Sequence, residues 1–137
     1  MSSPLPALQV DHIGIAAPAA GTALTRLLGC DAVEGREMPS GVAVGRFGPD
    51  RGLELVWEAR EGSPVGNFLR RRGPGLHHVA LRVDAPIEQL RERLQSESVR
   101  LIGEGIELSS DGRKCFFVHP EATDGVLIEI VEGEPGA

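Results

Sequence analysis

The sequence predicts an α+β fold built from two copies of one strand–helix–strand–strand–strand module. One observation is a repeated strand motif, at residues 10–16 and 76–83, with a histidine near its start and an Ala-Pro pair after it. Another is a repeated apolar strand with one central glutamate, Glu54 in the first half and Glu129 in the second. Two such pairs in matching order predict an internal duplication.

The first half predicts one helix and four strands. Residues 8–16 alternate between apolar and polar, as in a strand. A helix is expected over residues 18–28, because Pro18 lies in its first turn and Gly29 follows its last apolar residue. Turn-forming glycine and proline residues then separate three expected strands, at residues 31–36, 41–47 and 52–58.

A linking helix and a second copy of the module complete the chain. The helix is expected over residues 63–72, with Ser63 as its N-cap, Pro64 in its first turn and Gly73 at its end. The second half predicts a strand at 76–83, a helix at 86–96, and strands at 99–103, 114–119 and 125–131. We therefore expect a single domain over residues 1–137, with module 1 at about 7–60, the linking helix at about 63–72 and module 2 at about 75–132.

Four residues of the repeats have the character of metal ligands. Alternate side chains of a strand share a face, so the small residues Gly14 and Ala80 leave room in front of the histidine that precedes each. Each central glutamate lies among apolar residues, where a carboxylate is costly to bury unless a cation compensates its charge. The predicted ligands are His12, Glu54, His78 and Glu129.

This mixed nitrogen and oxygen set suits Co²⁺, Mn²⁺, Ni²⁺, Zn²⁺ or Fe²⁺. In octahedral geometry, four protein ligands would leave two positions for a bidentate oxygen substrate. Each residue taken alone has a structural alternative, a hydrogen-bonded strand histidine or a solvent-facing glutamate, but the matched pairs favour a metal site. His77 and His119 are expected to have structural or packing roles.

Composition limits the classes of partner. The net charge of −6 argues against nucleic acid or an anionic membrane as the main partner. Cys30 and Cys115 lack disulfide or metal-ligand spacing, so both are expected to be reduced. The sequence shows no signal-peptide pattern and no apolar run long enough to span a bilayer, which predicts a cytoplasmic protein. The arginine run at residues 70–72 is either a solvated helix end or a rim that attracts an anionic substrate tail.

These motifs resemble those of the vicinal oxygen chelate superfamily, which includes glyoxalase I, extradiol dioxygenases and methylmalonyl-CoA epimerase. The resemblance covers nearly the whole chain and is closest to the epimerase branch. It is carried by residues 11–16, 63–69, 75–81, 116–120 and 125–130.

The resemblance implies a glyoxalase-like fold, in which paired βαβββ modules form a half-open, barrel-like sheet around the metal. It also implies a metal-dependent epimerase, commonly a homodimer, that removes the α-proton of a 2-substituted malonyl-CoA. One acid–base role would belong to Glu129. The other belongs, in this family, to a glutamate just before the Gly-Val pair that opens the third strand.

The sequence departs from the family at this second position. Pro39 and Ser40 stand where the glutamate is expected, which leaves Glu37 as the candidate for the second proton carrier. The alternative for Glu37 is an exposed carboxylate at a strand end. Two other functions stay open: a superfamily isomerase, epimerase or lyase that acts on another acyl-CoA or a keto-sugar in secondary metabolism, and a non-catalytic ligand-binding or resistance protein.

Overall fold

The computed structural model describes residues 4–133. The ends of the predicted domain, residues 1–3 and 134–137, lie outside this range. The chain divides into two compact units: His12–His77 forms one, and the chain before His12 together with the chain from His78 onward forms the other. Among the described residues, no helix combines the length and the apolar character needed to cross a membrane.

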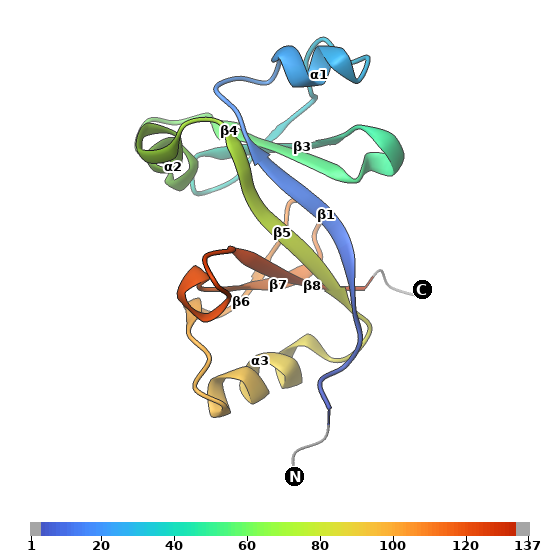
Figure 1. The fold of residues 1–137 in the computed structure, drawn as a ribbon, viewed down its shortest axis with the longest axis vertical. Helices are drawn as coiled ribbons and strands as arrows, with labels where there is room; N and C mark the ends of the chain where they lie inside the picture. Colours follow the sequence, from blue (N-terminus) through green and yellow to red (C-terminus); the bar gives the residue numbers. More distant parts are fainter. Residues whose placement is uncertain (1–3, 134–137) are drawn as a thin grey trace. The chain divides into compact units, whose positions relative to one another are not determined.

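The strands of the first module follow the order β2-β3-β4-β1 (Figure 1, where β1, β3 and β4 are labelled). Strands β1 and β4 pair in parallel, whereas β2–β3 and β3–β4 are antiparallel. The sheet therefore joins the first and last strands of the module side by side. The elements of the first module are β1 (Leu8–Ala16), α1 (Ala23–Leu27), β2 (Arg36–Glu37), β3 (Val42–Phe47) and β4 (Leu53–Glu58).

The second module repeats this topology, with its strands in the order β5-β8-β7-β6. Strands β5 and β8 pair in parallel, and the remaining pairs are antiparallel. The α+β class and the duplicated βαβββ module are thus confirmed. The elements are β5 (Gly75–Val83), α3 (Ile87–Ser96), β6 (Leu101–Leu108), β7 (Lys114–Val118) and β8 (Ile128–Glu132).

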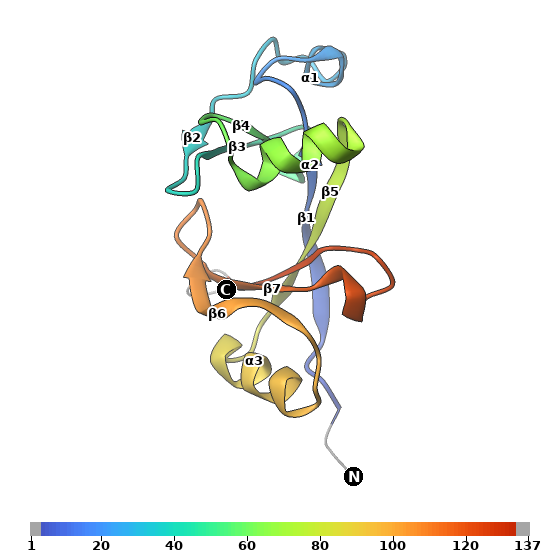
Figure 2. The same ribbon diagram turned by 90° about the vertical axis from the view of Figure 1, so that its left-hand side faces the viewer.

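Each unit packs a helix against its sheet. Helix α2 (Pro64–Arg72) packs beside β3 and β4 in the first unit (Figure 2), and α3 packs beside β7 and β8 in the other. In the first unit Val65 is buried in a cluster with Val44 and Val56. In the other, Ile87 is buried in a cluster with Phe116. Burying a side chain of this kind stabilises a fold by about 1.5–3 kcal/mol.

The start of α2 is fixed by Ser63 and Glu58. The Ser63 hydroxyl accepts a hydrogen bond from the Gly66 amide (3.2 Å) and donates one to the Glu58 carboxylate (3.0 Å). The Ser63 amide donates to the same carboxylate (3.1 Å). Desolvation raises the pKa of Glu58, but the bonds from Ser63 and the charge of Arg70 outweigh it, so the pKa is lowered. The predicted cap and helix are confirmed, and Gly73 (φ 76°) ends the helix.

Helix α1 is shorter than predicted. It begins at Ala23 instead of Pro18, because Thr22 forms a capping box with Thr25 and so defines a later start. It ends at Leu27, one residue before the predicted end, and the predicted cap at Gly29 is confirmed: the Cys30 amide donates to the Thr25 carbonyl (2.9 Å), and Gly29 has a φ of 79°. This arrangement is a Schellman motif, which favours glycine at its left-handed position.

Three strands also differ from the prediction. The strand expected at 31–36 is wrong except for Arg36, since β2 has two residues and the preceding segment forms bends. Strand β6 continues to Leu108, past Gly103, with an irregular register between Ile102 and Glu107. Strand β8 begins three residues late, because Gly125 has a φ of 94° within a turn.

Candidate metal centre

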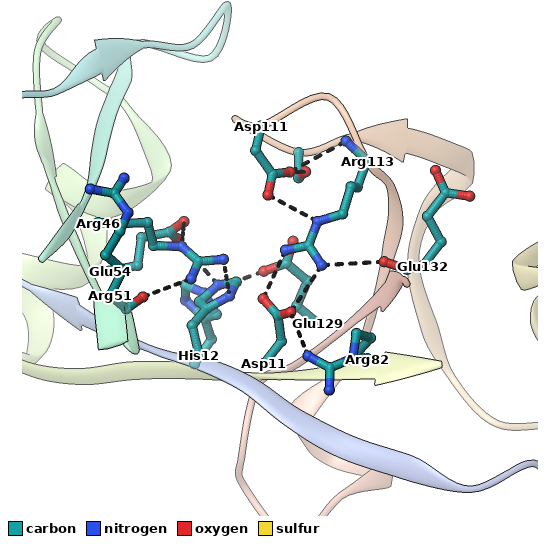
Figure 3. Close-up of polar contacts among 12 residues, drawn as sticks. Asp11, His12, Arg46, Arg51, Glu54, Arg82, Asp111, Arg113, Glu129 and Glu132 are labelled. Carbon is teal, nitrogen blue, oxygen red and sulfur yellow. Dashed lines mark hydrogen bonds and ion pairs between the residues drawn. The ribbon is translucent and has the colours of Figure 1, made fainter. Parts of the chain in front are cut away.

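In the unit His12–His77, the parallel pairing of β1 and β4 brings one predicted pair together. Gly14 pairs with Glu54, so the carboxylate lies next to the imidazole of His12, which precedes Gly14 on the same face. His12 Nε2 lies 3.6 Å from Glu54 Oε1, and both residues are buried (Figure 3).

In the other unit, β5 and β8 build an equivalent pair. Ala80 pairs with Glu129, and His78 Nε2 lies 3.4 Å from Glu129 Oε1. Both side chains are buried. Each pair thus offers an imidazole nitrogen and a carboxylate in a dry environment, where a carboxylate needs compensating charge. This donor chemistry fits a divalent cation.

The residue opposite each glutamate differs between the two units. Arg46 on β3 pairs with Glu54, whereas Phe117 on β7 pairs with Glu129. Arg46 Nη2 lies 2.7 Å from His12 Nδ1, and Arg46 Nε lies 3.6 Å from Glu54 Oε2 (Figure 3). The sequence analysis missed Arg46. A strand-by-strand alignment of the two modules would have revealed this arginine, because such an alignment matches it with Phe117 of the second module.

Cys115 is a second residue that the sequence analysis did not connect with the site. Burial raises the pKa of its thiol above the ordinary value, and the charge of Glu129 and a hydrogen bond to its carboxylate raise that pKa further. The thiol is therefore protonated and donates to Glu129. Both cysteines, Cys30 and Cys115, are free, as predicted.

A buried ion-pair network holds the residue that precedes His12. The guanidinium of Arg113 donates to both carboxylate oxygens of Asp11 (2.9 and 2.8 Å) and to Asp111 (2.9 Å), as Figure 3 shows. Arg82 approaches the same Asp11 carboxylate at 3.4 Å. The hydrogen bonds with Asp11 raise the pKa of Arg113, although desolvation opposes them. Network contacts of this kind carry no periodic signal in a sequence.

Glu37 lies in a different setting from the buried glutamates. It is an exposed residue of β2, and its Oε1 lies 2.8 Å from Nε of the exposed Arg60. Arg60 also donates to the Pro39 carbonyl, so the same guanidinium holds the turn where the family glutamate is missing. The acid–base role of Glu37 stays a prediction.

The remaining histidines have structural contacts. His77 packs edge-on against the Phe68 ring, with 4.9 Å between the ring centroids. His119 Nδ1 accepts a hydrogen bond from the Glu121 amide (3.0 Å) at the start of a short 3₁₀ turn. Within the arginine run, Arg70 donates to the Glu58 carboxylate (3.4 Å), and the Arg72 guanidinium lies 5.8 Å from the centre of the Phe68 ring.

A duplicated βαβββ fold with a buried His–Glu pair in each module defines a class of proteins, and comparison with known proteins identifies that class. The chain belongs to the Glyoxalase/Bleomycin resistance protein/Dioxygenase superfamily, whose family model matches residues 11–117. The predicted superfamily is thereby confirmed.

Several curated relatives and solved structures are epimerases. The chain is 30% identical to the ethylmalonyl-CoA/methylmalonyl-CoA epimerase of Cereibacter sphaeroides, over 89% of this chain and 96% of that protein. A solved structure of a variant of Streptomyces coelicolor methylmalonyl-CoA epimerase, in complex with 2-nitronate-propionyl-CoA, is similar with a TM-score of 0.75 and 28% identity, over 90% of this chain and 96% of that one.

Other curated relatives match over less of their length. The chain is 39% identical to the uncharacterized protein YqjC of Bacillus subtilis, over 58% of this chain and 56% of that protein. It also spans about half, 48%, of the methylmalonyl-CoA epimerase of Dictyostelium discoideum, at 35% identity over 58% of this chain.

Proposed function

We propose that the protein is a divalent-metal-dependent epimerase of 2-substituted malonyl-CoA thioesters. The observation that carries this proposal is the buried His–Glu pair that each unit holds at the same strand positions. The Cereibacter sphaeroides relative, which acts on ethylmalonyl-CoA and methylmalonyl-CoA, supports the substrate class. The propionyl-CoA analogue bound to the Streptomyces coelicolor enzyme supports an acyl-CoA partner.

The proposed metal ligands are His12, Glu54, His78 and Glu129. Both glutamates are buried in largely apolar strands, so a shared cation would compensate two carboxylates that are costly to bury alone. Co²⁺, Mn²⁺, Ni²⁺, Zn²⁺ and Fe²⁺ all suit this set. When bound, the ion would supply a Lewis acid that stabilises the negative charge developing on the thioester carbonyl oxygen.

Glu129 is the proposed proton carrier on one side of the substrate. Its carboxylate faces His78 Nε2 at 3.4 Å and accepts a hydrogen bond from Cys115, so two side chains fix its position. Glu37 is the proposed second carrier and would have to leave Arg60. That release is inexpensive, because an exposed ion pair stabilises a protein by about 0–1 kcal/mol.

The test follows the α-proton. We expect Co²⁺-loaded protein to deuterate and epimerise one methylmalonyl-CoA epimer in D₂O, and Glu129→Gln to abolish both. Loss of one acid or base costs roughly 10²–10⁴-fold, so Glu37→Gln should slow epimerisation by about that factor and leave deuteration on the Glu129 side. Glu61→Gln, at an exposed turn residue, is the control. Metal-loaded wild-type protein that catalyses neither process would refute the proposal.

A change of substrate is the second candidate function. It is favoured by the exposed position of Glu37 and by the absence of a glutamate at Pro39 and Ser40. An isomerase, epimerase or lyase of another acyl-CoA or a keto-sugar would keep the four ligands. Installing the missing side chain, as Ser40→Glu, would then create no malonyl-CoA epimerase activity, whereas a gain of activity would point back to an altered epimerase.

A non-catalytic binding protein of the same superfamily is distinguished by its metal content. Protein purified without chelator should contain close to one divalent ion per chain if the enzyme proposal holds, and its melting temperature should rise when Co²⁺ is added. A metal-free protein whose melting temperature ignores Co²⁺ would favour the binding role.

We also propose a homodimer. Two strands expose large apolar side chains, with Val10 on β1 62% exposed and Leu76 on β5 75% exposed, and a second copy of the chain would cover this apolar area. Sedimentation velocity should show a dimer that Val10→Asp weakens. A wild-type protein that sediments as a monomer at micromolar concentration would contradict this proposal.

A further inference from the structure

Arg46 gives one half of the proposed metal site a cation of its own. Its guanidinium reaches the His12 ring at 2.7 Å and the Glu54 carboxylate at 3.6 Å, and it also donates to the Arg51 carbonyl at 3.0 Å. Because a guanidinium only donates, Nδ1 of His12 is the acceptor, and Nε2 is the ring nitrogen on the Glu54 side. These three contacts hold the positive charge of Arg46 beside His12 and Glu54.

The other half has no equivalent charge at the matching position. Phe117 takes the register position opposite Glu129, and its ring packs edge-on against His78 with 6.3 Å between centroids. An apolar ring opposite one glutamate and a guanidinium opposite the other make the duplicated site asymmetric. The asymmetry is one of charge, since both halves keep the same histidine, glutamate and neighbouring small residue.

The charge balance shows what Arg46 changes. A neutral His12 that bound the ion through Nε2 would carry its proton on Nδ1, so Arg46 would have to release this ring and keep its contact with Glu54. Two carboxylates, two neutral histidines and one divalent ion sum to zero, so Arg46 would leave the loaded site with one positive charge. Its side chain is 20% exposed, so water screens this charge weakly. A site of that charge attracts anionic ligands and opposes entry of a second cation.

We propose that Arg46 is a specificity-determining residue of this site, which selects an anionic oxygen chelator, such as a carboxylate-bearing substrate, and weakens divalent-metal affinity in exchange. This inference rests on the proposed metal site. A guanidinium also offers paired N–H donors that match a carboxylate, which a lysine would not reproduce.

The test uses Co²⁺, whose visible spectrum reports ligands, with malonate as the anionic probe and imidazole as the neutral one. Relative to wild type, Arg46→Met should bind Co²⁺ at least tenfold more tightly and, once loaded, bind malonate at least tenfold more weakly. Imidazole affinity should stay within about twofold, because no ligand charge is involved. Arg46→Lys should keep the Co²⁺ affinity of wild type and recover only part of the malonate affinity.

Arg26→Met is the matched control, because it removes the same charge from an exposed position on α1 of the same unit. It should leave all three affinities unchanged. Equal losses of malonate and imidazole in Arg46→Met, or unchanged malonate affinity, would overturn the role of Arg46. Those outcomes leave the metal site intact, whereas wild-type protein that binds no Co²⁺ would overturn the metal site and this inference together.

Discussion

The Asp11–Arg113 pair is the most informative place to test how the protein tolerates buried charge. Arg113→Met keeps the length of the side chain and removes its charge and its donors. Asp111 is 47% exposed and can exchange its lost bond for water, but the Asp11 side chain is 7% exposed and cannot. Stranding such a carboxylate costs about 3–5 kcal/mol.

Arg82 sets the expected value within that range. It remains 3.4 Å from the Asp11 carboxylate and is itself one-third exposed, so it compensates part of the charge. We therefore expect Arg113→Met to lower the free energy of unfolding by about 3 kcal/mol, which for a chain of this size is a melting-temperature loss of roughly 10 °C.

A double-mutant cycle measures the coupling free energy between Asp11 and Arg113. It compares the chemical denaturation of the wild type, the two single variants and the double variant. Asp11→Asn alone should cost less than Arg113→Met, because an amide can still accept from Arg113. In the double variant the stranded charge is absent, so its stability should equal or exceed that of Arg113→Met. Additive losses, or a loss below about 1 kcal/mol for Arg113→Met, would refute the view that burial makes this pair costly to break.

Three further predictions concern local contacts. Gly66→Ala should destabilise the protein by about 1 kcal/mol in urea unfolding, because the new Cβ would lie 1.6 Å from the Glu58 carboxylate and must displace it from the helix cap. The control is Gly105→Ala, which should leave stability unchanged because no described atom lies within 4 Å of its Cβ. The pKa of Glu58 is lowered in the folded protein, so its carboxylate stabilises the fold above the ordinary pKa of 4.5, and this stabilisation is lost as pH falls through the folded pKa. The difference in unfolding free energy between wild type and Glu58→Gln should therefore shrink on acidification. A difference that does not change with pH would contradict this reasoning. A disulfide-exchange reagent should modify half-buried Cys30 in the native protein and Cys115 only after unfolding; rapid native modification of both would disprove the burial argument.

Regular strands and helix caps were the features that the sequence predicted best. Strand β1 has the predicted bounds, and α2 begins after the predicted cap at Ser63, because strand alternation and capping are local signals. The predicted start of α1 was wrong, and the reason is again local. Pro18 is compatible with a helix start, but the Thr22 cap competes with it and sets the observed start.

The site could be predicted only as far as its repeat extends. His12 and Glu54 recur as His78 and Glu129, and in each unit the parallel pairing places the two side chains together. Arg46 breaks the repeat. Its importance depends on a cross-strand register, which is a tertiary property that alternation along one strand does not encode.

The parallel pairing of each module's first and last strands has a consequence for folding kinetics. Ile13 pairs with Leu53, and Val79 pairs with Ile128, so each module closes by joining segments far apart along the chain. Such non-local closure must overcome the loop entropy first, and it slows folding. Each His–Glu pair therefore forms at the same step as module closure. Cation capture during refolding would report the moment at which the long loops close.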